Sequence, residues 1–187
     1  DDAGDRILTN TTLSVPSTYS TIALALAHLA DKSFAVGVTI TIQLADGTHS
    51  IGSGISFAHP QGSQIQIVGN TANPANCVVR SDVTAVAGFR ILPGQTLGLI
   101  NGVELQCGTT VTGRAVGGAG ILCDSGVVTV GPQFILRRFY FGFMARFGGV
   151  IWANGVSAVD RVKAYDCGDS AYIALLGGVI HAEYAYA

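Results

Sequence analysis

Charged side chains are scarce in this sequence of 187 residues. Asp, Glu, Lys and Arg make up 12% of the chain, about half the usual share of a soluble domain, whereas hydrophobic residues reach 49%. The formal net charge is −2, so the chain lacks the basic stripe that attracts nucleic acid. The composition argues against a nucleic-acid-binding protein. It indicates a chain that buries its surface between stacked strands or against partner subunits.

Long hydrophobic runs are also missing. A helix that spans a membrane needs about 20 consecutive apolar residues. The longest apolar segments, residues 21–30 and 171–180, are about half that length. We therefore expect no membrane insertion.

Paired cysteine motifs are absent as well. Cys77, Cys107, Cys123 and Cys167 include no CxxC pair, which argues against a zinc or redox motif. Four cysteines could form two disulfides, but a chain this apolar does not need them. We expect buried free thiols that pack as small hydrophobic side chains. The sequence indicates neither a metal site nor a cofactor.

Carboxylates are few, and glycoside hydrolysis requires two of them facing one groove. The densest charged segment, VDRVKAYDCGD, supplies the candidate catalytic residues Asp160, Asp166 and Asp169. One interpretation is an acidic-sugar or metal site on the flank of a coil. We favour the other, an exposed strand with alternating charges followed by a turn. Asp46 in ADGT and Asp124 in CDSG are interpreted as turn-forming residues.

One amphipathic helix is predicted near the N-terminus. In residues 17–32 the large apolar side chains fall on one face at helical spacing, and Ser17 or Thr18 is expected to cap the first turn. We divide the chain into an irregular lead-in (residues 1–16), a capping helix (17–35) and a β region (36–187).

After the helix, short strands with alternating apolar residues follow one another, and part of the sequence repeats. FGGVIWANGVSA at residues 147–158 returns as LGGVIHAEYAYA at residues 176–187, and SGVVTVGPQFI at residues 125–135 is a weaker copy. Such self-similarity is typical of a β-solenoid, whose successive coils share one core. A β-sandwich also has short strands, but it does not predict the repetition.

The copies predict how the coils align. The aligned glycines are 23 and 29 residues apart and are expected to mark the same corner of successive coils. The valine after each glycine is expected to face inward, so that Val127, Val150 and Val179 form one ladder. Because the last copy breaks off at Ala187, we expect either further coils in the native protein or a partner that covers the end of the stack, and we favour further coils.

Residues 134–147, FILRRFYFGFMARF, combine aromatic side chains with arginine. On one interpretation the segment is a platform for acidic sugars, with the ligand-binding candidates Arg137, Arg138, Tyr140, Arg146 and Trp152. We favour another, in which some aromatics fill the coil interior. The rest, within residues 139–147, pack against a neighbouring subunit, because interfaces are rich in Tyr, Phe and Arg.

The segment YSTIALALAHLADK, the strand that ends in ADGT (residues 45–48) and the glycine-punctuated coils follow in a familiar order. This order resembles the right-handed parallel β-helix of bacteriophage tailspikes and tail fibres, within the wider pectate-lyase-like group. The resemblance implies an all-β fold with an N-terminal capping α-helix that covers the first coil. It also implies a homotrimer in the tail of a virion and recognition of host-surface polysaccharide.

The residues leave two functions open. The chain is either a structural and host-recognition segment of a trimeric tail fibre or tailspike, or a polysaccharide lyase or glycoside hydrolase of the pectate-lyase-like group. Secretion is the alternative to a virion location. The scarcity of carboxylates favours the first function.

Overall fold

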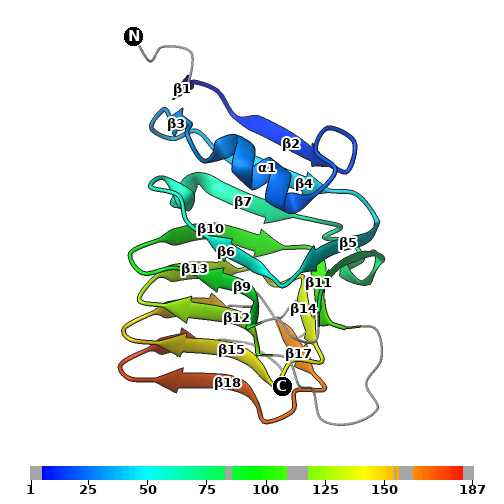
Figure 1. Ribbon diagram of the computed structural model, residues 1–187, viewed down its shortest axis with the longest axis vertical. Helices are drawn as coiled ribbons and strands as arrows, with labels where there is room; N and C mark the ends of the chain where they lie inside the picture. The colour runs from blue at the N-terminus through cyan, green and yellow to red at the C-terminus, as the bar shows by residue number, and fades with distance from the viewer. Residues whose placement is uncertain (1–5, 83–85, 109–117, 154, 156–161, 183–187) are drawn as a thin grey trace.

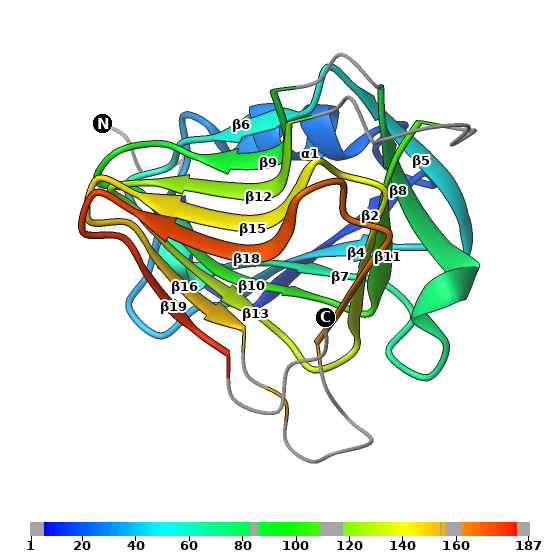
Figure 2. The same ribbon diagram turned by 90° about the horizontal axis from the view of Figure 1, so that it is seen from below.

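The computed structural model describes residues 6–82, 86–108, 118–153, 155 and 162–182. These residues wind into successive coils, and each full coil supplies one strand to each of three parallel sheets (Figure 1). Seen along the axis, the three sheets surround a common interior (Figure 2). The predicted all-β fold, a parallel β-helix with an α-helix near its N-terminal end, is confirmed. Its right-handed sense stays a prediction.

The first sheet contains β2 (Thr11–Val15), β4 (Ile40–Leu44), β7 (Ile65–Val68), β10 (Thr96–Asn101), β13 (Val127–Val130), β16 (Val150–Ala153) and β19 (Val179–His181). The second contains β5 (Gly47–Gly52), β8 (Cys77–Ser81), β11 (Val103–Cys107), β14 (Phe134–Arg137) and β17 (Lys163–Tyr165). The third contains β6 (Ile55–Phe57), β9 (Ala87–Ile91), β12 (Ala119–Asp124), β15 (Phe141–Arg146) and β18 (Ser170–Leu175). The remaining elements are the helix α1 (Ile22–Leu29), the strand pair β1 (Arg6–Ile7) and β3 (Ser33–Phe34), and the 3₁₀ turns η1 (Gly62–Gln64) and η2 (Pro74–Asn76).

The repeated phrase occupies equivalent positions of adjacent coils. Val150 pairs with Val127 on one side and with Val179 on the other, as the spacings of 23 and 29 residues predict. The predicted inward direction of these valines is wrong. The residues that follow them, such as Val128 and Ile151, are the fully buried ones. Because side chains alternate along a strand, an error of one residue moves the whole ladder to the outer face.

Two consecutive glycines recur at this corner for different reasons. In the turn from β15 to β16, Phe147 and Gly148 have φ angles of 54° and 79°, in the left-handed region that favours glycine. A Cβ on the next residue, Gly149, would lie 2.3 Å from the carbonyl oxygen of Cys123 in the preceding coil. Residues 176–178 repeat the turn one coil later, again with positive φ at the first two positions. One glycine therefore turns the chain, and the other lets the coils approach closely.

One continuous cluster of aliphatic and aromatic side chains fills the interior. From the aromatic segment 134–147, Phe134, Phe139 and Phe143 are completely buried in it. The prediction that part of this segment fills the core is confirmed. Phe139 and Phe143 are therefore unavailable for the subunit contact expected within residues 139–147, whereas Phe147 is 53% exposed.

The helix α1 and the strand β2 lie at the N-terminal end of the stack, next to the first full coil (Figure 1). Ile22, Ala25 and Leu29 of α1 are buried in the core. Within the described residues, no helix has the length and apolarity needed to cross a bilayer.

Two boundaries at this end differ from the prediction. Residues 11–15, expected in the irregular lead-in, form β2 and pair with β4. The helix begins after Thr21, whose Oγ1 accepts a hydrogen bond from the backbone N–H of Leu24 at 3.1 Å, so the predicted cap at Ser17 or Thr18 is wrong.

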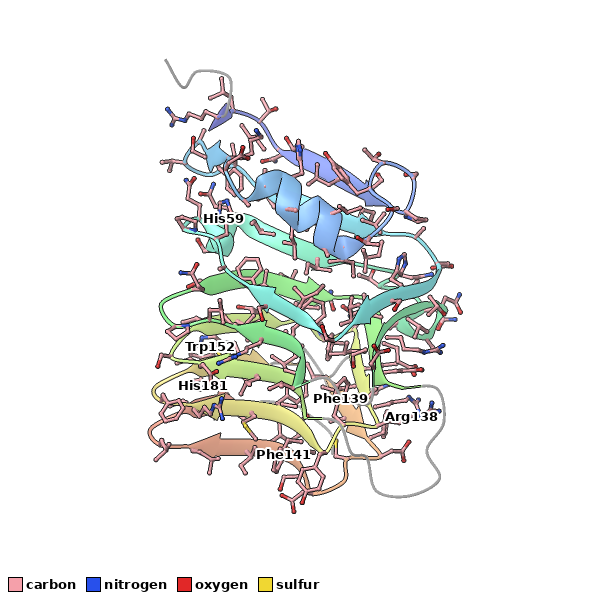
Figure 3. The ribbon with its side chains drawn as sticks, viewed as in Figure 1. His59, Arg138, Phe139, Phe141, Trp152 and His181 are labelled. Atoms are coloured by element: carbon pink, nitrogen blue, oxygen red, sulfur yellow. The ribbon has the colours of Figure 1, made fainter. Side chains whose placement is uncertain are left out.

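Side chains of the β6–β7 connection fasten the segment after α1 to the coils. His59 is buried, and its Nε2 lies 3.0 Å from the carbonyl oxygen of Leu29 (Figure 3). Its Nδ1 accepts a hydrogen bond from the backbone N–H of Gln61, so the proton resides on Nε2 and is donated to Leu29. The His59 ring stacks on Phe34 at a centroid distance of 4.7 Å, and the Gln61 side chain bonds both the N–H and the carbonyl of Phe34.

None of the four cysteines forms a disulfide, which confirms the prediction of thiols. Burial is the main cause that raises the pKa of Cys77, Cys123 and Cys167 to about 11. The thiolate is the reactive form, and a raised pKa leaves very little of it near neutral pH.

Candidate functional site

The predicted ligand-binding residues are distributed over different outer surfaces of the solenoid. Arg137 lies on the second sheet, Arg146 on the third and Trp152 on the first. Arg138 and Tyr140 lie at the corner between the second and third sheets. Figure 3 shows Arg138 and Trp152 on opposite sides of the molecule in that view. The five residues therefore do not form a single platform.

One corner brings four of the candidates together: Arg138, Tyr140, Asp166 and Asp169. The backbone N–H of Asp169 donates to the carbonyl oxygen of Tyr140 at 2.8 Å, so the turn after β17 stacks on the turn after β14. Arg138 and Asp166 occupy equivalent places in the two turns, with φ angles of 68° and 53°. Asp166 and Asp169 are exposed. Asp160 lies outside the described residues.

The outer face of the second sheet carries a column of side chains from four adjacent strands. Arg80, Gln106, Arg137 and Tyr165 stand in register on β8, β11, β14 and β17, and we name these four residues the arginine column. Nη2 of Arg80 donates to Oε1 of Gln106 at 3.4 Å, and Cζ of Arg137 lies 4.9 Å from the centre of the Tyr165 ring. All four side chains are half-buried. The column is thus an ordered strip that runs from coil to coil.

Glu104 lies beside the arginine column on β11 and is buried. Its Oε1 lies 3.1 Å from Nε of Arg137, so the two side chains form an ion pair. The geometry at Nε is not that of a hydrogen bond. Nε2 of Gln106 donates to the same oxygen. Glu104 therefore serves as the partner of these two side chains and does not stand as an isolated acid facing a groove.

Asp124, at the end of β12 on the third sheet, binds two arginines. Its Oδ2 accepts a hydrogen bond from Nε of Arg90 at 2.9 Å, and its Oδ1 accepts one from Nε of Arg146. Burial acts to raise the pKa of Asp124, but the hydrogen bonds from Arg146 and Arg90 outweigh it, and the pKa is lowered. The hydrogen bond to Asp124 likewise raises the pKa of Arg146. Asp124 is a strand residue in an ion-pair triad, so its interpretation as a turn former is wrong.

On the first sheet, Trp152 of β16 stacks on His181 of β19. Their ring centroids are 3.8 Å apart and the ring planes differ by 5°. His181 therefore covers one face of the indole, and a sugar ring that stacks on an aromatic face would have to use the other. Trp152 is 39% exposed and forms part of the apolar outer surface of the last coils.

Two hollows lie near the N-terminal end. One of about 320 Å³ lies between α1 and β6; its lining is mostly apolar, and the ring nitrogens of His59 within it already have partners. The other, of about 360 Å³, is lined mostly by polar residue types, among them Asp46, His49 and Ser50. Neither lining contains two carboxylates. Within the described ranges, no group of three or more His, Cys, Asp or Glu side chains is placed to hold a metal ion.

Sequence reasoning missed Arg80, Gln106 and Arg90. The sequence contained a signal for the ion-pair triad on the third sheet, because Asp124 and Arg146 both lie just before the aligned glycines. The structure places these two residues in register on adjacent coils. No such signal existed for Arg80 and Gln106. They are 26 residues apart, in a part of the chain where the phrase does not recur.

In comparisons with known proteins, no family model matches this chain, and no curated protein and no solved structure matches it. The resemblance to phage tailspikes therefore rests on the fold and on the order of its elements.

Proposed function

We propose that this chain is a structural and host-recognition segment of a trimeric bacteriophage tail fibre or tailspike, located in the virion, that contacts surface polysaccharide. The observation that carries the proposal is the arginine column, an ordered strip of charged and hydrogen-bonding side chains on rigid strands. Neighbouring strands lie about 4.8 Å apart. A linear polysaccharide also repeats its polar groups along its length, so a chain lying along the solenoid axis would meet one side chain after another.

The buried carboxylates support recognition over cleavage. Glu104 is engaged by Arg137 and Gln106, and Asp124 by Arg90 and Arg146. A hydrolase needs one carboxyl group that gives up or takes a proton and a second that faces the same sugar bond. The arginine hydrogen bonds lower the pKa of Asp124, which makes it a poor general acid.

Exposed apolar side chains support the trimeric assembly. Phe147, Trp152, Leu176 and Val179 are exposed and belong to the last two coils, around the turns that join the third sheet to the first. Phe147 and Leu176 also have positive φ angles, which are costly for bulky residues. Soluble monomers rarely keep such a patch uncovered, and contact with a second copy would remove it from water.

Binding and cleavage assays on one set of purified bacterial surface polysaccharides test the functional proposal. We expect binding, measured by biolayer interferometry, without release of oligosaccharide. Reproducible release would favour the alternative, a polysaccharide lyase or glycoside hydrolase. A lack of binding to every polysaccharide in the set would contradict the recognition role.

Light scattering on the purified chain tests the assembly. We expect a mass near three times the 19.2 kDa of one chain at micromolar concentration. A double variant, Phe147→Ser with Leu176→Ser, should shift the mass toward the monomer. A wild-type mass of a single chain would refute the trimer.

A further inference from the structure

The outer face of the second sheet carries a surplus of positive charge. Among the outward residues of its strands, Arg80, Arg137 and Lys163 are cationic and Glu104 is the one anion, which leaves a net charge of +2. The whole chain has a net charge of −2. This positive surplus makes the outer face of the second sheet a candidate binding surface for an anionic group. Two charges are fewer than the basic stripe that nucleic acid requires.

Within the part of the chain that the structure describes, the two guanidinium groups of the arginine column use few of their donors. A guanidinium has five N–H donors. Arg80 uses one of them, in the long contact of 3.4 Å to Gln106. Nε of Arg137 and Nε of Arg80 are both buried without a hydrogen-bond acceptor among the described residues, so a ligand would have to use the terminal Nη groups. A carboxylate can bind the two Nη groups of a guanidinium with two parallel hydrogen bonds.

The neighbours of Arg137 hold its guanidinium in place before any ligand arrives. Glu104 fixes its Nε side through the ion pair, and the Tyr165 ring lies against its plane. The side chain is still 35% exposed. A group that is positioned in advance loses less conformational entropy when it binds.

The spacing of the column selects an extended ligand. Arg80 and Arg137 are separated by two strand spacings, about 10 Å, and the amide of Gln106 lies between them. A polymer along the axis would present one carboxylate to each arginine and a hydroxyl group to Gln106. This arrangement suits a polysaccharide of uronic acids, in which carboxylates recur along one chain.

We infer that the arginine column binds the carboxylates of an acidic polysaccharide laid along the solenoid axis, with Arg80 and Arg137 each taking one carboxylate. The inference rests on the proposed polysaccharide recognition and specifies its ligand class and site.

Biolayer interferometry on the full chain at low salt tests the inference with three probes. Polygalacturonate carries a carboxylate on every sugar, hyaluronate carries one on alternate sugars, and fully methyl-esterified polygalacturonate keeps the backbone without the charge. We expect the wild type to bind at least one of the two acids and to bind the ester at least tenfold more weakly. Added salt should weaken the binding, because ionic contacts at a surface are screened.

Variants locate the site. Each charge-assisted hydrogen bond contributes enough that Arg80→Gln should weaken binding about tenfold or more. Arg137→Lys keeps a positive charge beside Glu104, so the fold should be preserved. The variant loses the planar guanidinium that can bind a carboxylate with two hydrogen bonds, and it should also weaken binding about tenfold. Arg6→Gln removes one exposed charge on β1, away from this face, and should bind like the wild type.

Three results would overturn the inference: equal binding of the ester and the acid, unchanged binding in both Arg80→Gln and Arg137→Lys, or no binding of either acid. If the wild type still binds a neutral surface polysaccharide, the recognition role stands and only this ligand class and site are lost.

Discussion

Replacing Asp124 with Asn tests the ion-pair triad on the third sheet, because the change removes one charge and preserves the size of the side chain. The Asp124 side chain is 5% exposed, whereas those of Arg90 and Arg146 are 40% and 32% exposed. Breaking a fully buried ion pair costs about 3–5 kcal/mol. Water still reaches both arginines in the variant, so we expect a smaller loss of unfolding free energy, about 2 kcal/mol at pH 7.

The effect should depend on pH in a defined direction. The pKa of Asp124 in the folded chain lies below its ordinary value of 3.8, because the arginine hydrogen bonds outweigh burial. A lowered folded pKa gives stability that is complete above the unfolded pKa and is lost as the pH falls through the folded pKa. The difference between wild type and Asp124→Asn should therefore be constant from pH 7 to about pH 5 and should narrow below about pH 4.

Urea unfolding monitored by the fluorescence of the single tryptophan, Trp152, measures this difference. Equal slopes for wild type and variant would show that the shift in midpoint reports stability alone. Asp166→Asn, at an exposed corner, is the matched control and should leave the midpoint unchanged. If Asp124→Asn unfolds at the wild-type midpoint at pH 7, or if its deficit persists undiminished at pH 3, the ion-pair reasoning fails.

Three further changes test the fold. Ile151→Asp places a charge in the core and should cost several kcal/mol, whereas Val150→Asp on the outer face should cost less than about 1 kcal/mol; equal urea midpoints would contradict the assigned directions. Gly54→Ala should melt well below Gly94→Ala, since both glycines have positive φ but only a Cβ on Gly54 would meet a neighbour, the carbonyl oxygen of Ala87 at 1.9 Å. Equal melting temperatures would show that the close approach is absent. The thiols should react slowly with Ellman's reagent at pH 8 in the native chain and completely in guanidinium chloride, because burial raises the pKa of three of them to about 11. Rapid native reaction would refute their protection.

The solenoid could be predicted because its corners impose a sequence requirement that recurs. Gly149 has a backbone carbonyl of the adjacent coil where a Cβ would be, and the equivalent Gly178 has another. The direction of the strands could not be predicted in the same way. Val150 and Ile151 are both β-branched and apolar, so the alternation of apolar and polar residues does not show which of them faces the core. The turn decides which of the two faces inward.

The first residue of the helix α1 also could not be predicted from the sequence. Several residues between Pro16 and Ile22 are good helix caps, and their local preferences do not distinguish them. The structure decides between them because the backbone N–H groups of Thr18 and Tyr19 both donate to the carbonyl oxygen of Ser14. This turn occupies the chain just after β2, and the helix begins only after it, with Thr21 as its N-cap.

The candidate site depends on coil length, which local sequence does not give. Arg80, Gln106 and Arg137 become neighbours only because the intervening loops bring each coil back into register. Among the predicted ligand-binding residues, adjacency in sequence proved misleading. Arg137 and Arg146 come from one segment, but they lie on different sheets with different partners, Glu104 and Asp124.

Because charged residues are scarce in this chain, the ion pairs that its carboxylates form are informative. In a chain with 12% charged residues, most outer positions of the strands carry no charge at all. Glu104 and Asp124, the buried carboxylates among the described residues, each pair with arginine, and both arginines of the third sheet bind Asp124. On the second sheet, Glu104 is outnumbered by cations, and Arg80 and Arg137 use few of their donors on residues that the structure describes. Structural pairing therefore accounts for the charges of the third sheet but not for those of the second, and a ligand that supplies carboxylates would account for the remainder.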